Sequence, residues 1–339
     1  MFTRTKIIAE AGVNHNGSLE RAKQLIKIAA ESGADVVKFQ TFSASKIASE
    51  STPLADYQQN NNLIKNQLEL LSSLEIPYNW YQELLNYSKK LNIEFASTAF
   101  EIDGVDFLDD LGQCFFKIAS GELTNKPLIE HIAKKGKKII ISTGMANVDE
   151  INEALNLCYN HGVSKNDVTL LHCNTQYPSP YEDLNLNAIG AMRSTFGVDV
   201  GYSDHSLGIE VPIACVSLGA TVIEKHFTID RNDIGPDHAA SIEPHELKKM
   251  IESIRNIEKA ISGSGHKTPS KSEVKNRVIA RRSIHLVKDV LKGAVIKSND
   301  LMMMRPGDGI SPMQLNEIIG KKYTMDLPNG TKLKWENIQ

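Results

Sequence analysis

Two histidines, His205 and His226, are the residues whose type and spacing point most directly to chemistry. Each closes a short apolar segment of the sequence, and we interpret these segments as the seventh and eighth strands of a parallel sheet. Both imidazoles would then lie at the same sheet end, within reach of one divalent ion. A lone histidine more often satisfies backbone groups or caps a loop. The pairing favours a metal site with open positions for water or substrate oxygens.

Two lysines, Lys38 and Lys117, interrupt apolar segments in which an ammonium group is costly unless a partner offsets the loss of water. Phosphate is a natural candidate for that partner. Hydroxyl groups at other segment ends could add hydrogen bonds to a phosphate or its carboxylate: Thr98, Ser120 and Ser203. The lysines could instead form internal ion pairs with three nearby glutamates: Glu10, Glu122 and Glu224. Together, the lysines and hydroxyls favour an anion site.

Glu10 ends the first apolar segment, at KIIAEAG. Its carboxyl could position or protonate a reacting carbonyl. It could equally be a structural carboxylate paired with Lys38 or Lys117, and composition alone leaves both interpretations open.

The elements that must position these side chains alternate between short aliphatic segments and amphipathic stretches of helical period. Eight such segments predict strands, at residues 6–12, 35–42, 93–100, 114–121, 138–144, 168–174, 198–205 and 221–227. Eight strand–helix units in about 250 residues predict a (β/α)8 TIM barrel, whose functional groups gather at the C-terminal ends of the strands. Every predicted strand end is polar. Residues 43–77 are rich in Asn, Gln and Ser and predict an insertion with its own helix.

The pattern changes after the barrel, which we expect to occupy residues 1–262. Residues 263–281 are polar and basic, with glycine and proline interruptions, and predict a linker. Residues 282–339 contain short strand-like runs separated by turn signals, which predict a compact second domain.

Composition limits the functional classes. The 339 residues carry a formal net charge of −3, so no basic surface for nucleic acid is expected. The four cysteines are widely spaced and show no Cys-x-x-Cys pair, which indicates a reducing cytoplasm. No apolar run is long enough for a secretion signal or a membrane span.

Ordered motifs along almost the whole chain carry a specific resemblance. They are IIAEAGVNHNGS, VKFQTF, FASTAF, FKIASGELTN, IISTGMA, LHCNTQYPSPYEDLNL, GYSDHSLG, IEKHFTID, GPDHAASIEP and RPGDGISP. This set resembles the sialic acid synthases, a family that includes N-acetylneuraminate, N,N'-diacetyllegionaminate and pseudaminate synthases. The resemblance implies a barrel followed by a small antifreeze-like (SAF, β-clip type) domain, in a homodimer in which that domain is swapped to cap the partner's barrel.

The resemblance also implies a role for each matching residue. His205 and His226 would be ligands of a catalytic divalent metal, with Mn²⁺ expected first and Mg²⁺ or Co²⁺ as alternatives. Glu10 would contact the reacting carbonyl of an open-chain sugar. Phosphoenolpyruvate (PEP) would be held by Lys38, Thr98, Lys117, Ser120 and Ser203. The sugar would be surrounded by Gln40, Tyr177 and Asp237, with Arg305 reaching in from the partner subunit. Two positions depart from the family pattern: Ala99 replaces a proline, and Phe39 stands where some members have histidine.

The implied reaction joins C3 of PEP to the aldehyde of an N-acylated mannosamine. Water then traps C2, and the intermediate loses phosphate. The motifs leave the sugar open between N-acetylmannosamine and 2,4-diacetamido-2,4,6-trideoxymannose.

Three alternatives differ in chemistry. A lysine Schiff-base aldolase could use Lys38 or Lys117, although the histidine pair argues against it. A related PEP-dependent synthase could take a phosphorylated aldose, although the C-terminal domain argues against that. A non-enzymatic carbohydrate- or ice-binding protein would need no dense polar barrel mouth.

Overall fold

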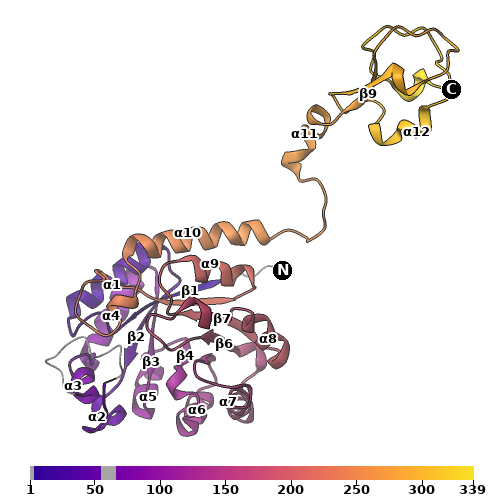
Figure 1. The fold of residues 1–339 in the computed structure, drawn as a ribbon. Coiled ribbons are helices and arrows are strands. Elements are labelled where there is room, and N and C mark those ends of the chain that lie inside the picture. The colour runs from indigo at the N-terminus through magenta and orange to yellow at the C-terminus, as the bar shows by residue number, and fades with distance from the viewer. Residues whose placement is uncertain (1–3, 55–65) are drawn as a thin grey trace. The chain divides into compact units, whose positions relative to one another are not determined.

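The computed structural model describes residues 4–54 and 66–339 (Figure 1). The chain divides into two compact units, Met1–Ser262 and Gly263–Gln339, which are described separately. No helix among the described residues is long and apolar enough to cross a membrane.

The first unit is a barrel of eight parallel strands surrounded by helices (Figure 1). The strands are β1 (Lys6–Gly12), β2 (Val36–Thr41), β3 (Glu94–Ala99), β4 (Phe115–Ile118), β5 (Lys138–Ser142), β6 (Val168–Cys173), β7 (Asp199–Asp204) and β8 (Val222–His226). Each lies inside one of the eight segments predicted from the sequence, so the predicted barrel is confirmed. β1 pairs with both β2 and β8, which places the first and last strands side by side.

Helices follow the strands and cover the outside of the barrel. They are α1 (Leu19–Ser32), α4 (Tyr78–Lys90), α5 (Ile102–Asp110), α6 (Lys126–Lys134), α7 (Val148–Asn160), α8 (Ala188–Phe196), α9 (Glu210–Ser217) and α10 (Pro244–Ile261). In α1 the Ser18 hydroxyl accepts a hydrogen bond from the Arg21 backbone N–H, and Gly33 ends the helix with a φ of 86°. The helices and the outward strand faces share the largest apolar core of the molecule.

The barrel seam lies between β3 and β4, which share no backbone ladder in the described part of the chain. The side-chain amide of Gln113 bridges this seam. Its Oε1 accepts from the Ser97 N–H at 2.7 Å, and its Nε2 donates to the carbonyls of Ser97 at 3.0 Å and Phe115 at 2.9 Å. One buried amide therefore takes the place of a ladder.

The barrel interior is built in layers, because every second residue of a strand points inward. One layer is an apolar floor, formed by Ile8, Val36, Ala96, Phe115, Ile140, Leu171 and Val222. β7 contributes Gly201 at this level, where a Cβ would lie 2.3 Å from the Val222 carbonyl oxygen and 2.7 Å from a Leu171 methyl group. The close approach of β8 thus requires a glycine.

The predicted insertion at 43–77 contains two described helices, α2 (Ala44–Ile47) and α3 (Gln67–Ser72). Residues 55–65 lie outside the described part of the chain. Asn66 caps α3 by accepting a hydrogen bond from the Glu69 N–H at 2.9 Å.

The second unit contains α11 (Lys271–Ala280), the antiparallel pair β9 (Ser283–Leu286) and β10 (Leu301–Met304), and α12 (Leu315–Ile318). α11 lies within the segment expected to be a linker. The small core of the unit consists of Ile284, Leu286, Val290, Ile296, Ile310, Ile318, Tyr323, Leu327 and Leu333. Isolated bridges such as Tyr323 to Ile338 hold together a domain that has little regular structure.

Candidate active site

One cavity of about 420 Å³ opens at the C-terminal ends of the barrel strands. Its lining includes every predicted site residue of the first unit, namely Glu10, Lys38, Gln40, Thr98, Lys117, Ser120, Tyr177, Ser203, His205, His226 and Asp237. The twelfth predicted residue, Arg305, belongs to the second unit, where it is exposed and donates through Nε to the Ala280 carbonyl at 2.9 Å. The barrel alone therefore brings together eleven of the twelve.

Strand alternation explains this convergence. Two residues after each floor position comes an inward-facing ring: Glu10, Lys38, Thr98, Lys117, Ser142, Cys173, Ser203 and Glu224. Two residues further lies an upper ring that includes Gln40, His205 and His226. In each strand, the side chains that line the cavity therefore lie directly above a floor residue of the same strand, which is Gly201 in β7 and apolar in the others.

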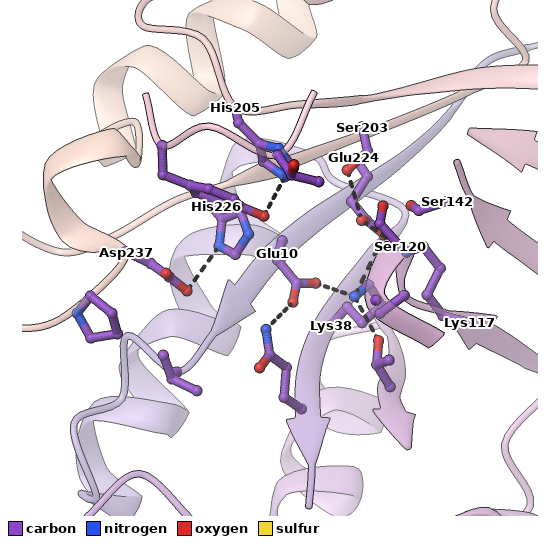
Figure 2. A pocket seen from close by; sticks show the side chains of 18 of the residues that line it. Glu10, Lys38, Lys117, Ser120, Ser142, Ser203, His205, Glu224, His226 and Asp237 are labelled. Atoms are coloured by element: carbon purple, nitrogen blue, oxygen red, sulfur yellow. Dashed lines mark hydrogen bonds and ion pairs between the residues drawn. The ribbon is translucent and has the colours of Figure 1, made fainter. Parts of the chain in front are cut away.

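Four charged groups of the lower ring form one buried network (Figure 2). Lys38 Nζ lies 2.5 Å from Glu10 Oε2 and 3.5 Å from Glu224 Oε2, and it donates to Thr98 Oγ1 at 2.9 Å. Lys117 Nζ lies 3.5 Å from Glu224 Oε1. Two of the glutamates weighed as ion-pair partners thus do pair with the lysines. The third, Glu122, accepts from the Asn125 side chain instead.

The two carboxylates of this network differ in proton affinity. Burial raises the pKa of Glu10 to about 7, against the opposing effect of Lys38. Burial would also raise the pKa of Glu224, but Lys117 and Lys38 outweigh it and hold that pKa at about 2. Burial lowers the pKa of Lys117, whereas for Lys38 the nearby Glu10 and Glu224 outweigh burial and raise the pKa. Glu10 is therefore the carboxyl that can exchange a proton near neutrality.

The two histidines lie side by side at the cavity mouth, at the ends of the neighbouring strands β7 and β8, with ring centroids 5.6 Å apart (Figure 2). His205 Nδ1 lies 2.5 Å from the Asn174 carbonyl and must donate to it, so Nε2 carries the lone pair, 3.0 Å from the Tyr177 hydroxyl. His226 Nδ1 is buried without a hydrogen-bond partner and lies 3.6 Å from Asp237 Oδ2. Burial lowers the pKa of His226, and it lowers the pKa of His205 to about 3. Both rings are therefore neutral at pH 7.

These residues fit a divalent ion. Metal binding needs neutral imidazole, and His226 Nδ1 is buried with no hydrogen bond that would occupy it, although Asp237 Oδ2 lies 3.6 Å away. No cluster of three or more metal-ligating side chains occurs in residues 4–54 and 66–339. An ion bound by two imidazoles would therefore take oxygen ligands from water or substrate, as catalytic sites require.

Two backbone features aim the groups on β1. The β1–β2 register shifts between Glu10, which pairs with Lys38, and Gly12, which pairs with Phe39. Such bulges re-aim side chains beside active sites. Gly12 has a φ of 51°, and a Cβ there would lie 3.1 Å from His226 Cε1 and 3.4 Å from Asp237 Oδ2. A glycine therefore leaves room for the histidine ring.

Several cavity residues were not among the predicted site residues. Glu224, considered from the sequence only as an ion-pair partner, and Ser142 both end predicted strands, and the alternation that selects Lys38 and Lys117 points to them as well. The Ser142 hydroxyl is buried without a partner and lines the cavity. The leucines of α3 carried no such signal, because they lie in a polar insertion. The two positions that depart from the family pattern, Phe39 and Ala99, are buried and do not line the cavity.

Comparisons with known proteins match both units. The family model described as NeuB family matches residues 25–267, and the SAF domain model matches residues 281–339. An N,N'-diacetyllegionaminic acid synthase of Campylobacter jejuni is 50% identical over 322 residues, covering 95% of this chain and 96% of that protein. A Legionella pneumophila protein of the same name is 46% identical, covering 98% and 94%. A pseudaminic acid synthase of Helicobacter pylori is 35% identical, covering 100% and 99%.

Solved structures agree with these sequence matches. The crystal structure of an N-acetylneuraminic acid (sialic acid) synthetase from Leptospira borgpetersenii, in complex with citrate, superimposes with a TM-score of 0.72 at 34% identity. That match covers 81% of this chain and 90% of the other.

Proposed function

This chain belongs to the NeuB family and carries a SAF domain at its C-terminal end, and from that premise we propose the reaction that it catalyses. It joins PEP to the aldehyde carbon of an N-acylated mannosamine-type sugar and releases phosphate, which gives a nine-carbon sialic-acid-type product. The supporting observation is a single cavity that places buried lysines and hydroxyls beside two neutral imidazoles.

PEP carries a phosphate and a carboxylate, and the lower ring supplies donors for both. Lys38 and Lys117 provide the positive charge, and hydroxyl donors come from Thr98, Ser120 and Ser203. Ser142 adds a hydroxyl that has no other partner. The Ser120 hydroxyl already accepts from the Gly144 N–H at 3.1 Å, which fixes its oxygen and leaves its proton free to turn toward an anion or the Cys173 sulfur.

The sugar aldehyde would lie in the upper ring, next to the histidines. A divalent ion, Mn²⁺ first and Mg²⁺ or Co²⁺ as alternatives, would be held by His205 and His226 and would polarise the aldehyde oxygen. Glu10, whose pKa is about 7, can donate a proton to that oxygen as C3 of PEP bonds to the aldehyde carbon. Gln40 Nε2 lies 3.5 Å from Glu10 Oε1 and orients this carboxyl. Water then adds to C2, and the bond from C2 to the phosphate oxygen breaks.

The second unit of a partner subunit would complete the site. We place Arg305 of that unit against the acyl group of the sugar, in a homodimer whose SAF domains are exchanged between barrels. Arg305 is exposed, and the methionines that precede it, Met302 and Met304, are exposed as well. Exposed apolar side chains next to a charged one are typical of a surface that a partner protein covers, here the barrel of the other subunit.

Phosphate release from PEP tests this proposal. The assay contains Mn²⁺ and either N-acetylmannosamine or 2,4-diacetamido-2,4,6-trideoxymannose. Release is expected with at least one sugar and should disappear with a chelator or in His205→Ala. His245→Ala is the matched control, because His245 is exposed on α10 and does not line the cavity. Absence of release with either sugar, from folded and metal-loaded dimer, would contradict the proposed reaction.

The lowered pKa of Lys117 favours one second candidate, a Schiff-base aldolase. Such an enzyme would be inactivated by borohydride in the presence of a carbonyl substrate and would resist chelators. We expect the reverse: loss of activity with chelator and no covalent adduct on Lys117 by mass spectrometry.

A further inference from the structure

The cavity has an apolar wall that neither PEP nor a metal ion uses. The wall consists of Val13, Leu70, Leu71, Leu74 and Phe100. PEP is anionic at both ends and has no alkyl group that would be stabilised there. The wall must therefore face another part of the reacting molecules.

The position of the wall follows from the strand order. Val13 comes just after β1 and Phe100 just after β3, so both lie beyond the strand ends, above the ring of charged groups. Phe42, just after β2, packs edge-on against Phe100, with ring centroids 6.1 Å apart at 87°. Leu70 and Leu74 are buried against Val13 and Phe42. The wall thus covers the β1–β3 side of the mouth, and the histidines occupy the β7–β8 side.

The leucine-bearing segment is held in place at both ends. The Gln67 N–H donates to the Thr52 carbonyl at 3.2 Å, and the Ala44 N–H donates to Glu75 Oε1 at 2.5 Å. A Cβ on Gly17 would lie 2.9 Å from the Ser73 carbonyl oxygen, so the loop after β1 packs directly against the end of α3. These contacts make the wall a preformed surface.

We propose that this wall is the subsite for the distal carbons of the sugar and that it selects a sugar bearing methyl groups there. This inference rests on the proposed function. With the aldehyde carbon near His205, His226 and Glu10, the wall offers an apolar surface in the same cavity, and we place the chain from C4 to C6 against it. The preferred substrate is then 2,4-diacetamido-2,4,6-trideoxymannose, whose C4 acetamido methyl and C6 methyl can contact the leucines.

N-Acetylmannosamine carries hydroxyls at C4 and C6 in place of those groups. The five wall side chains offer no hydrogen-bond partner, so the C6 hydroxyl would lose water there without compensation, whereas the C6 methyl of the trideoxy sugar would not. Substrate discrimination by apolar pockets is on the order of 100-fold. We expect kcat/KM for the trideoxy sugar to exceed that for N-acetylmannosamine by roughly this factor.

Steady-state kinetics of the full-length dimer with both sugars test the subsite. Leu71→Gln and Leu70→Gln place an amide in the wall and should reduce the preference at least about tenfold, mainly through a loss of kcat/KM for the trideoxy sugar. Leu68→Gln is the matched control, because Leu68 is half-buried on the same helix but does not line the cavity. It should retain the wild-type preference. Leu71 is half-buried too, so its variant should fold even if Leu70→Gln does not.

The outcomes separate the two proposals. No phosphate release with either sugar overturns the proposed function. Equal kcat/KM for both sugars, or a preference for N-acetylmannosamine, overturns only the subsite. An unchanged preference in folded Leu71→Gln also overturns it. 6-Deoxy-N-acetylmannosamine serves as an intermediate probe, and in wild-type protein it should be used better than N-acetylmannosamine, because it restores the C6 methyl alone.

Discussion

At the scale of single residues, Glu10 and Glu224 share Lys38 as a partner yet differ widely in pKa. Glu224 faces two lysines, whereas Glu10 has a single close ammonium and also feels the negative charge of Glu224. An identical side chain therefore serves as a permanent anion at one position and as a proton carrier at the other.

This difference predicts a pH-dependent stability. The native pKa of Glu10, about 7, exceeds its unfolded value of 4.5, so between these pH values the native state binds the extra proton. The stabilisation is present below pH 4.5 and is lost as pH rises through 7. Between pH 4.5 and 8, the free energy of unfolding of metal-free wild-type protein should fall by about 1–3 kcal/mol relative to that of Glu10→Gln. Urea titrations of both proteins across this range check it, and a constant difference would show that Glu10 is ionised throughout.

The sequence identified most of the charged ring, because a lysine or histidine inside an apolar strand is conspicuous. It did not distinguish between an anion site and internal ion pairs. The structure contains the ion pairs in the same cavity as the hydroxyls, and two of those hydroxyls bond to the network itself, Thr98 to Lys38 and Ser203 to Glu224, so the two interpretations are compatible. The roles of the individual residues remain predictions that the assays above address.

At the scale of elements, Gln113 is the feature that the sequence could not reveal. A glutamine before a strand has no periodic signal, and its bridging role depends on the missing ladder between β3 and β4. The eight strands, in contrast, were predictable because an aliphatic run with a polar end recurs eight times.

Replacement of Gln113 by leucine should weaken the seam. It leaves the Ser97 N–H and the carbonyls of Ser97 and Phe115 buried without the amide as a partner. The free energy of unfolding of the barrel should fall by about 3–5 kcal/mol. Urea unfolding followed by Trp80 fluorescence, in a Trp335→Phe background, reports the barrel unit alone. Gln82→Leu is the control, because Gln82 makes an exposed hydrogen bond to Asn86. A Gln113→Leu barrel as stable as this control would show that the seam does not need the bridge.

The outward faces of β7 and β8 carry a buried ion pair between Lys225 and Asp204. Lys225 Nζ lies 2.5 Å from Asp204 Oδ2 and donates to the Ser206 carbonyl at 2.7 Å, and both charged side chains are fully buried. These residues directly precede the histidines His205 and His226. The pair therefore fixes the two strand ends that present the imidazoles.

Breaking this pair should be costly. Lys225→Met leaves the Asp204 carboxylate buried without its cation and should destabilise the barrel by about 3–5 kcal/mol. The double variant Asp204→Asn with Lys225→Met should recover much of that loss, because no buried charge remains. Lys46→Met, which removes an exposed ion pair with Asp103, should cost about 1 kcal/mol or less. Equal losses in the single and double variants would contradict the ion-pair explanation.

At the scale of the whole molecule, the site as we propose it combines residues of two subunits. Arg305 and the barrel residues belong to different compact units of the chain. The sequence predicted this division from the basic, glycine-containing segment after the barrel, but only the family resemblance gave Arg305 a role.

Mixed dimers test whether the units are exchanged between subunits. Arg305→Ala and His205→Ala should each be inactive alone. After the two variants are unfolded and refolded together, about half of the dimers are mixed, and one of their two sites combines an intact barrel with an intact cap. Phosphate release should then recover to about a quarter of the wild-type rate. No recovery, with mixed dimers present by mass spectrometry, would place both groups in the same subunit.

The layered barrel interior also constrains how such a chain can evolve. Each strand places its floor residue and its chemical group two positions apart, so a one-residue insertion or deletion between them would exchange inward and outward side chains. The extra residue of β1 is accommodated because its bulge comes after Glu10. Between the floor and the charged ring, descendants of this barrel can therefore change their strands only by substitution. Length variation is confined to segments beyond the strand ends, such as the insertion that carries the leucines of the apolar wall. New substrate preferences can arise in these segments without disturbing the charged ring below.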